Sequence, residues 1–204
     1  MRIGWNDLRS RMTLMFVGLP LLVQVATLSP AESIPFAEQT GFIRQMTQYL
    51  LQHAIRQGAA WACAGLEVAL AVNISARDLE DRAFAQRIAR WLAAEGLPPG
   101  LPCLEVPETA LMEEPEHAVE LLREVRGIGV EVAIDDYGSG FSSLAYLKTL
   151  WVHELKIDRA FIDAMQDSAR DATIVRSTIE LGHSLGLKVT AEGVENERQV
   201  ALLR

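Results

Sequence analysis

Two neighbouring carboxylates, Asp135 and Asp136, stand where an apolar run ends and a glycine-rich turn begins, in the stretch "AIDDYGSG". A plain turn or helix cap needs only one aspartate. Carboxylate oxygens are the hard ligands that Mg²⁺ prefers, and adjacent carboxylates suit two divalent ions a few ångströms apart, the arrangement that activates water and neutralises a phosphodiester. The pair therefore indicates a divalent-metal site, and a capped turn is the alternative reading.

Other groups of the same chemistry end further apolar runs. Asn73 ends "VALAVN", Glu105 lies in "LPCLEV", Lys156 in "HELKID", and Glu192 ends "LKVTAE". Short continuous apolar runs are typical of strands buried on both faces. Each predicted strand thus carries, at its carboxyl end, a group able to bind metal or phosphate. The spacings between these groups are 32, 30, 21 and 36 residues, which scatter around the roughly 31-residue repeat of an eight-unit barrel of about 250 residues.

Helical patterns separate the predicted strands. Apolar residues recur at helical spacing, and capping signals mark the helix ends, over residues 41–57, from Ser75 to about Glu95, 114–129, 142–149, 170–185 and from Asn196 onward. Alternating strands and helices predict parallel βαβ units. A TIM-like barrel gathers its site at the carboxyl ends of all its strands, whereas a doubly wound sheet, the second candidate, gathers ligands at one switch point. The distribution over five strands favours the barrel.

Composition sets broad limits on function. The 204 residues are 50% hydrophobic and 23% charged, an ordinary globular balance for one sizeable domain or two small ones. The net charge of −8 argues against a surface that coats duplex nucleic acid, but it leaves room for a small phosphate ligand bound through a metal. Two cysteines, Cys63 and Cys103, give no sign of a secreted disulfide scaffold. We therefore expect a cytoplasmic protein.

The amino-terminal segment, residues 1–28, has a different character. Arg2, Arg9 and Arg11 precede an apolar run over residues 12–28, close to the lower limit of about 17 residues for a membrane span. Three interpretations of this segment are open: a signal peptide, a membrane-associated segment, or two short buried strands that replace strands of the barrel. We favour the soluble reading.

Five motifs in order carry a resemblance to a known family: "VNIS", "LEVPET", "IDDYGSGFSSLAYLKTL", "ELKIDRAFI" and "LKVTAEGVEN". From about Ser29 to Arg204 the chain resembles the EAL domain family of bacterial phosphodiesterases, which linearise cyclic di-GMP to pGpG in second-messenger signalling. The resemblance implies an EAL-type TIM barrel over residues 29–204, with one or two Mg²⁺ or Mn²⁺ ions at its rim.

The resemblance also implies a role for each site residue. The metal ligands would be Asn73, Glu105, Asp135, Asp136 and Glu192. The catalytic groups would be Lys156, Glu192 and Asp136, with Lys156 orienting the attacking water or stabilising nearby charge. The supporting residues would be Glu108, Glu195, Gly138, Ser139 and Gly140, with Glu108 steadying the glycine-rich loop.

The chain departs from the family pattern in ways that bear on activity. No Glu-Ala-Leu occurs anywhere, although its glutamate is a metal ligand in the family, and the chain ends before the last barrel strand. Smaller departures place Pro107, Trp151 and His153 where the family usually has Thr, Pro and Asp. We therefore expect an incomplete barrel with altered first strands. The alternative function is a catalytically degenerate module that binds cyclic di-GMP or a protein partner, and a homodimer stays open.

Overall fold

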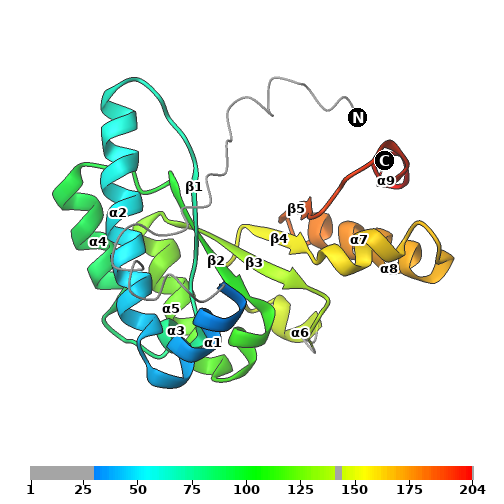
Figure 1. The fold of residues 1–204 in the computed structure, drawn as a ribbon, viewed down its shortest axis with the longest axis horizontal. Helices are drawn as coiled ribbons and strands as arrows, with labels where there is room; N and C mark the ends of the chain where they lie inside the picture. The colour runs from blue at the N-terminus through cyan, green and yellow to red at the C-terminus, as the bar shows by residue number, and fades with distance from the viewer. Residues whose placement is uncertain (1–29, 141–143, 204) are drawn as a thin grey trace.

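The structure is built on a curved, parallel β-sheet (Figure 1). The computed structural model describes residues 30–140 and 144–203, so the predictions for residues 1–28 lie outside the described residues. The sheet contains β1 (Leu70–Asn73), β2 (Pro102–Pro107), β3 (Glu131–Tyr137), β4 (Glu154–Ile157) and β5 (Lys188–Ala191). All five predicted strands are therefore present.

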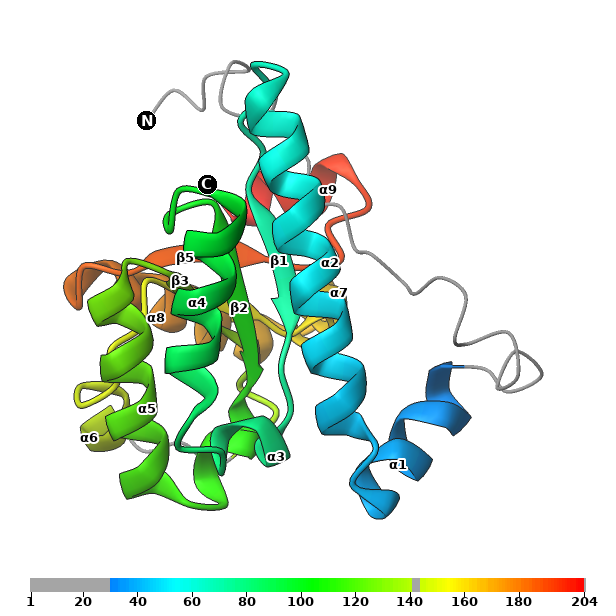
Figure 2. The same cartoon turned by 90° about the vertical axis from the view of Figure 1, so that its left-hand side faces the viewer.

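The order of the strands separates the two candidate folds. The sheet runs β1-β2-β3-β4-β5, and every neighbouring pair is parallel. Crossovers between parallel strands are right-handed, so a sheet that always adds its next strand on the same side carries its helices on one face. Figure 2 shows α2, α4 and α5 together in front of β1, β2 and β3. This is the winding of a TIM-like barrel, as predicted, and not that of a doubly wound sheet.

The helices follow the predicted alternation. They are α1 (Pro30–Thr40), α2 (Ile43–Cys63), α3 (Ala76–Leu79), α4 (Phe84–Glu95), the 3-10 turn η2 (Glu108–Met112), α5 (Pro115–Ile128), α6 (Leu144–Leu147), α7 (Arg159–Ala164), α8 (Ala169–Ser184) and α9 (Glu197–Leu202). Helices α1, η2 and α7 were not predicted. No helix in the described ranges is long and apolar enough to cross a membrane.

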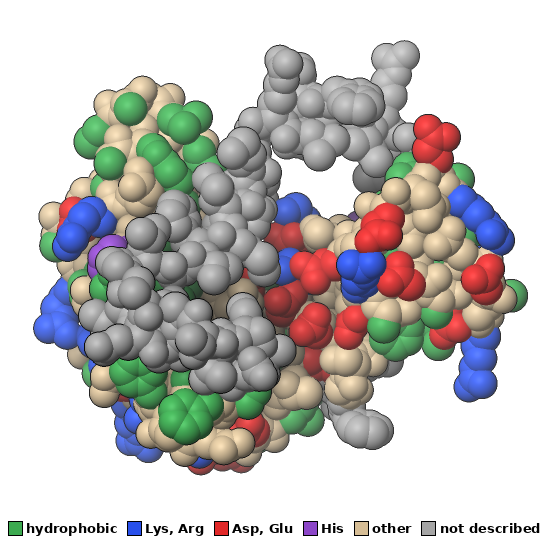
Figure 3. Space-filling view, in the orientation of Figure 1, with side chains coloured by type: hydrophobic (Ala, Val, Ile, Leu, Met, Phe, Trp, Pro, Cys, Tyr) green, Lys and Arg blue, Asp and Glu red, His purple; other side chains and the backbone are tan. Residues whose placement is uncertain are grey.

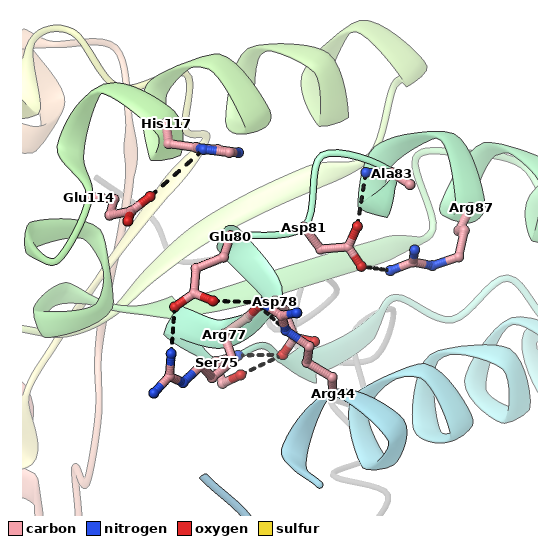
Figure 4. Close-up of polar contacts among 10 residues, drawn as sticks. All are labelled: Arg44, Ser75, Arg77, Asp78, Glu80, Asp81, Ala83, Arg87, Glu114 and His117. Atoms are coloured by element: carbon pink, nitrogen blue, oxygen red, sulfur yellow. Dashed lines mark hydrogen bonds and ion pairs between the residues drawn. The ribbon is translucent and has the colours of Figure 1, made fainter. Parts of the chain in front are cut away.

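The single helix predicted from Ser75 to Glu95 is wrong, because two helices occupy that stretch (Figure 4). Ser75 does begin α3, in a capping box with Asp78. The chain then turns at Asp81, whose carboxylate accepts a hydrogen bond from the backbone N–H of Ala83 at 2.9 Å and pairs with Arg87. An aspartate that bonds the backbone two residues on forms a turn of its own. This turn ends α3 and starts α4.

The two faces of the sheet differ in chemistry. Side chains alternate between faces along a strand, and the outward-pointing ones pack into the helix layer: Leu70, Val72, Leu104, Val106, Val132 and Ile134 are all 9% exposed or less. The opposite side chains at the carboxyl ends of β1, β2 and β3 are Asn73, Glu105 and Asp135. The core therefore fixes the strands from one side and presents polar groups on the other.

Gly58 allows α2 to lie close to β1. A Cβ at this position would be 2.5 Å from Cδ1 of Leu70 and 3.3 Å from Cδ2 of Leu97, both buried side chains. Gly58→Ala is expected to lower the free energy of unfolding by about 1–3 kcal/mol, because overpacking forces buried neighbours to shift. Urea denaturation measures the change.

Gly127→Ala is the matched control for this prediction. Gly127 is also helical, lies in α5 and has no atom within 4 Å of the added Cβ. This change is expected to raise stability by about 0.5–1 kcal/mol, because alanine is the better helix former. Equal effects at the two positions would contradict the close approach of α2 to β1.

His153 extends the pairing of β3 with β4 through its side chain. Its backbone N–H donates to the carbonyl of Val132 at 2.8 Å, and its Nδ1 accepts from the N–H of Val132 at 3.1 Å. Burial lowers the pKa of His153, nearby Arg126 lowers it further, and Glu131 opposes the shift. Nδ1 accepts this bond only while it carries no proton. Protonation of His153 at low pH therefore removes the hydrogen bond between its side chain and the N–H of Val132.

The pH dependence of stability follows from the lowered pKa of His153. The unfolded chain binds this proton near its ordinary pKa of about 6.5, whereas the folded chain binds it only at lower pH, so stability falls as pH drops below about 6.5. His153→Asp is expected to reduce this loss by on the order of 1 kcal/mol, the value of one hydrogen bond, because an aspartate stays an acceptor down to about pH 4. Urea melts of both proteins at pH 7 and pH 5 measure it, and equal losses would contradict it.

Candidate active site

Acidic side chains gather on the face shown in Figure 3, between the helices of the amino-terminal half and α7 with α8. The sheet register explains the gathering. Asn73 of β1 is paired with Glu105 of β2, and Asp135 of β3 is paired with Pro107, two residues after Glu105. Parallel strands end at the same edge of a sheet, so their terminal residues meet there.

Lys156 of β4 lies at the centre of this edge. Its Nζ is 2.6 Å from Oε1 of Glu192, 2.8 Å from Oδ1 of Asp135 and 2.9 Å from Oε1 of Glu105. The lysine is 8% exposed and Glu105 is 4% exposed. Burial by itself lowers the pKa of Lys156, but its hydrogen bonds to the three carboxylates outweigh burial and raise it. The ammonium group therefore stays charged at neutral pH.

Asp136 departs from regular strand geometry, which explains how two consecutive carboxylates serve one site. In a regular strand Asp135 and Asp136 would point to opposite faces. The pairing of β3 with β4 shifts register between Ile134 and Tyr137, and Asp136 has a φ of 51°. A bulge re-aims a side chain, and aspartate is among the few residues that tolerate this left-handed region.

As a result, Asp135, Asp136 and Glu192 each offer a carboxylate oxygen, and these oxygens lie within 4.8 Å of one another. Burial is the largest cause that raises the pKa of Asp136, and the charges of Asp135, Asp158 and Glu192 add to it. Burial likewise raises the pKa of Glu105. Three carboxylates contact the ammonium group of Lys156, and Asp136 lies beside two of them, so carboxylates outnumber the single positive charge. This excess of hard oxygen donors fits one or two divalent cations.

Glu108 contacts the glycine-rich loop beside the carboxylates, the loop that the family resemblance implied it would steady. Its Oε2 accepts hydrogen bonds from the N–H of Gly138 at 2.7 Å and of Gly140 at 3.1 Å. Glu108 is 2% exposed. A Cβ at Gly140 would lie 3.0 Å from Cδ of Glu108. The hydroxyl of Ser139 donates to the carbonyl of Asp136 at 2.7 Å and closes the turn.

The two remaining predicted site residues, Asn73 and Glu195, have different surroundings. Asn73 is exposed at the end of β1 beside Glu105. Glu195 faces Arg159 of α7 instead of the central lysine: its Oε1 is 2.6 Å from Nη2 of that arginine. Behind the end of β1, the carboxylate of Asp78 accepts from the N–H and the hydroxyl of Ser75, which fixes the chain just beyond Asn73 (Figure 4).

Sequence reasoning missed the contacts of α7. Phe161 packs on Gly138, where an added Cβ would be 2.8 Å from the phenylalanine ring. Arg159 contacts the turn after β5, and Gln199 of α9 accepts from the N–H of Glu195 at 2.7 Å. Of the contacts in this region, only the one between Asn196 and Gln199 could be predicted from the sequence, because a polar residue three positions after a helix cap is typical of a capping box.

The sequence model of the EAL domain family matches residues 22–204. The chain is 38% identical over 181 residues to the bifunctional diguanylate cyclase/cyclic di-GMP phosphodiesterase MucR of Pseudomonas aeruginosa, covering 88% of this chain and 26% of MucR. It is 38% identical over 174 residues to the signaling protein YkoW of Bacillus subtilis, covering 85% of this chain and 22% of YkoW. The chain thus spans about a quarter of the length of these relatives.

Solved structures agree with this match. The MucR phosphodiesterase in complex with c-di-GMP has a TM-score of 0.81 at 38% identity, over 86% of this chain and 72% of that one. The EAL domain of DcpA from Mycobacterium smegmatis has a TM-score of 0.73 at 35% identity, over 79% of this chain and 73% of that one. The chain therefore shares the EAL-domain fold over most of its length.

Proposed function

Because the chain belongs to the EAL domain family, we propose that it is a phosphodiesterase unit that hydrolyses cyclic di-GMP to linear pGpG. The observation that carries the proposal is the meeting of Glu105, Asp135, Asp136, Lys156 and Glu192 at one edge of the sheet. Relatives named as cyclic di-GMP phosphodiesterases, MucR and NbdA of Pseudomonas aeruginosa among them, support the choice of substrate.

The donor set suggests how the residues divide the work. Asp135, Asp136 and Glu192 would hold one or two divalent ions, with Glu105 and Asn73 as further oxygen ligands. Mg²⁺ and Mn²⁺ are the ions we propose, since both take hard oxygen ligands. When bound, such ions supply an activated water near neutral pH and neutralise charge on the phosphodiester.

Lys156 and Glu108 would assist hydrolysis in ways that do not require them to bind a metal ion. The buried ammonium group of Lys156 stays positive, so it can orient a water or stabilise negative charge that develops on the phosphate, where a fixed charge in a partly dry site is most effective. Glu108 keeps the loop of residues 138–140 in place beside Asp135 and Asp136. Glu192, half-buried at the end of β5, would accept a proton from the water or bind metal.

A direct assay tests the proposal. Purified protein is incubated with cyclic di-GMP and Mn²⁺, and the products are separated by chromatography. Linear pGpG is expected, and its formation should stop when EDTA removes the metal. Cyclic di-GMP that stays intact at high protein concentration would exclude hydrolysis by this chain.

One observation favours a second function, a module that binds cyclic di-GMP or a protein partner without turnover. The sequence contains no Glu-Ala-Leu, and losing one metal ligand weakens metal binding. Calorimetry with cyclic di-GMP, with and without Ca²⁺, separates the two functions: heat of binding without product supports the binding module, and no heat in either condition removes its ligand-binding version.

The cellular location, the domain bounds and the partners of the chain are also proposed. We infer a cytoplasmic location, consistent with Cys63 and Cys103, which are both free thiols. Residues 29–204 are proposed as the EAL-like domain and residues 1–28 as a divergent segment. A homodimer or a protein partner in signalling fits the family, whereas duplex nucleic acid does not fit the acidic charge. Light scattering of the purified chain measures the oligomeric state.

A further inference from the structure

We propose that Arg159 is a positioning residue that holds Glu192 against Lys156 by fixing the turn that follows β5. The consequence for metal binding and turnover rests on the proposed function, whereas the contact itself does not. Arg159 begins α7, directly after β4, and reaches a turn more than thirty residues later in the chain.

Among the three carboxylates that contact Lys156, Glu192 has the least support from the sheet. It follows β5, which within the described residues pairs only with β4, and its backbone N–H makes a bond of 3.2 Å to the carbonyl of Ile157. The Glu192 side chain is 31% exposed, compared with 13% for Asp135 and 5% for Glu105. Its position therefore depends on what holds the chain just beyond it.

Arg159 provides that hold in two ways. Its Nη2 lies 2.6 Å from Oε1 of Glu195, while its Nε lies 3.1 Å from Oδ2 of Asp163 one helical turn further along α7. Its aliphatic stem covers Gly193, where an added Cβ would be 2.4 Å from Cγ of Arg159. Gly193 has a φ of 68°. The arginine thus contacts the first and third residues after Glu192.

Gln199 secures the far end of the same turn. Its Oε1 accepts from the N–H of Glu195 at 2.7 Å and of Asn196 at 3.2 Å, and its Nε2 donates to Oδ1 of Asp163 at 3.2 Å. Gln199 is 1% exposed. Gln199 therefore anchors the backbone at Glu195 and Asn196, and the ion pair of Arg159 adds a second anchor through the side chain of Glu195, three residues after Glu192.

The ion pair of Arg159 is exposed to solvent, so we expect it to contribute little to the free energy of unfolding. Exposed pairs contribute little to unfolding free energy. Partners that orient a metal ligand nevertheless have large effects, since changing them typically costs 10- to 100-fold in metal affinity or activity. The proposal therefore predicts a functional effect without a matching loss of stability, which a merely structural surface arginine would not show.

The test compares Arg159→Met with Arg159→Lys and with the control Arg56→Met. Methionine keeps an aliphatic stem over Gly193 but removes the charge, lysine restores a charge, and Arg56 is a similarly exposed arginine paired with one glutamate, Glu95, at 3.3 Å. Calorimetry measures Mn²⁺ affinity, steady-state kinetics separates kcat from KM, and hydrogen exchange reports on residues 192–196.

For Arg159→Met we expect roughly tenfold weaker Mn²⁺ binding and roughly tenfold lower kcat with little change in KM. Amide exchange over residues 192–196 should be at least about threefold faster, as for a locally loosened segment. Arg159→Lys should recover part of each effect. Arg56→Met should match the wild type, and circular dichroism should give similar melting curves for all four proteins.

One outcome would overturn the proposal, and a second would separate it from the proposed function. Wild-type Mn²⁺ affinity together with wild-type exchange in Arg159→Met would show that the arginine does not hold the turn. If the wild-type chain itself binds no Mn²⁺, the proposed function fails, and exchange over residues 192–196 alone decides the positioning role. Should Arg159→Met fold poorly, Glu195→Gln removes the same ion pair from the other side and must show the same faster exchange.

Discussion

Lys156→Met is expected to abolish most turnover while the protein keeps its affinity for Mn²⁺. The ammonium group lies within 2.9 Å of three carboxylates, so in the proposed mechanism it is a fixed positive charge beside the site and a competitor of metal ions for the same oxygens. Removing a fixed charge that stabilises a transition state typically costs about 10²- to 10³-fold in kcat. Removing the competitor takes one positive charge from the site and frees the carboxylate oxygens that it contacted, so metal binding is expected to be unchanged or tighter.

Hydrolysis assays and Mn²⁺ calorimetry on the same preparation measure this separation. Lys188→Met is the matched control, because Lys188 is a lysine of the neighbouring strand whose single carboxylate partner, Glu154, lies 2.9 Å away and outside the metal cluster. It should keep wild-type kcat. A Lys156→Met protein that turns over normally, or that loses Mn²⁺ binding together with activity, would contradict the role given to Lys156.

Asp135→Asn is expected to remove metal-dependent stabilisation. Asp135 belongs to the cluster with Asp136 and Glu192 and also contacts Lys156. A ligand that binds only the folded state at 100 times its dissociation constant adds about 2.7 kcal/mol to the free energy of unfolding. The wild type should show a gain of this size with Mn²⁺, and Asp135→Asn should show almost none, because the substitution removes one charge and one ligand oxygen.

Thermal melts with Mn²⁺ and with EDTA measure the difference. Asp167→Asn serves as the control, because the side chain of Asp167 is 92% exposed and makes only a 3.9 Å pair with Arg198. It should keep the full gain. A wild-type gain that survives in Asp135→Asn would place the ion elsewhere on the chain.

The sequence was sufficient to predict the sheet and the edge where the site lies. Continuous apolar runs identified all five strands, and the carboxyl ends of parallel strands meet at one edge whatever the details of packing. That argument alone brought Glu105, Asp135, Lys156 and Glu192 together, and the structure places the three carboxylates around the lysine. The family resemblance added the contact of Glu108 with its loop.

Features that depend on local backbone departures or on distant contacts were not predictable in this way. The bulge that turns Asp136 towards Asp135 arises from a register shift, which no period-two pattern reveals. The break after α3 depends on one aspartate that bonds its own backbone. The pair of Arg159 and Glu195 joins segments far apart in the chain, and two charged residues in a sequence carry no sign that they are partners.

The strand order also sets the sequence of events during synthesis. Each strand pairs with the one made just before it, so the sheet can grow from its amino-terminal edge while the chain emerges from the ribosome at about 5–20 residues per second. The acidic residues of the site are synthesised with successive strands, and Glu192 is the last of them to join the sheet. A divalent ion held by Asp135, Asp136 and Glu192 would therefore meet all three carboxylates only after β5 has joined the sheet, so metal loading would report that the nascent sheet has reached β5.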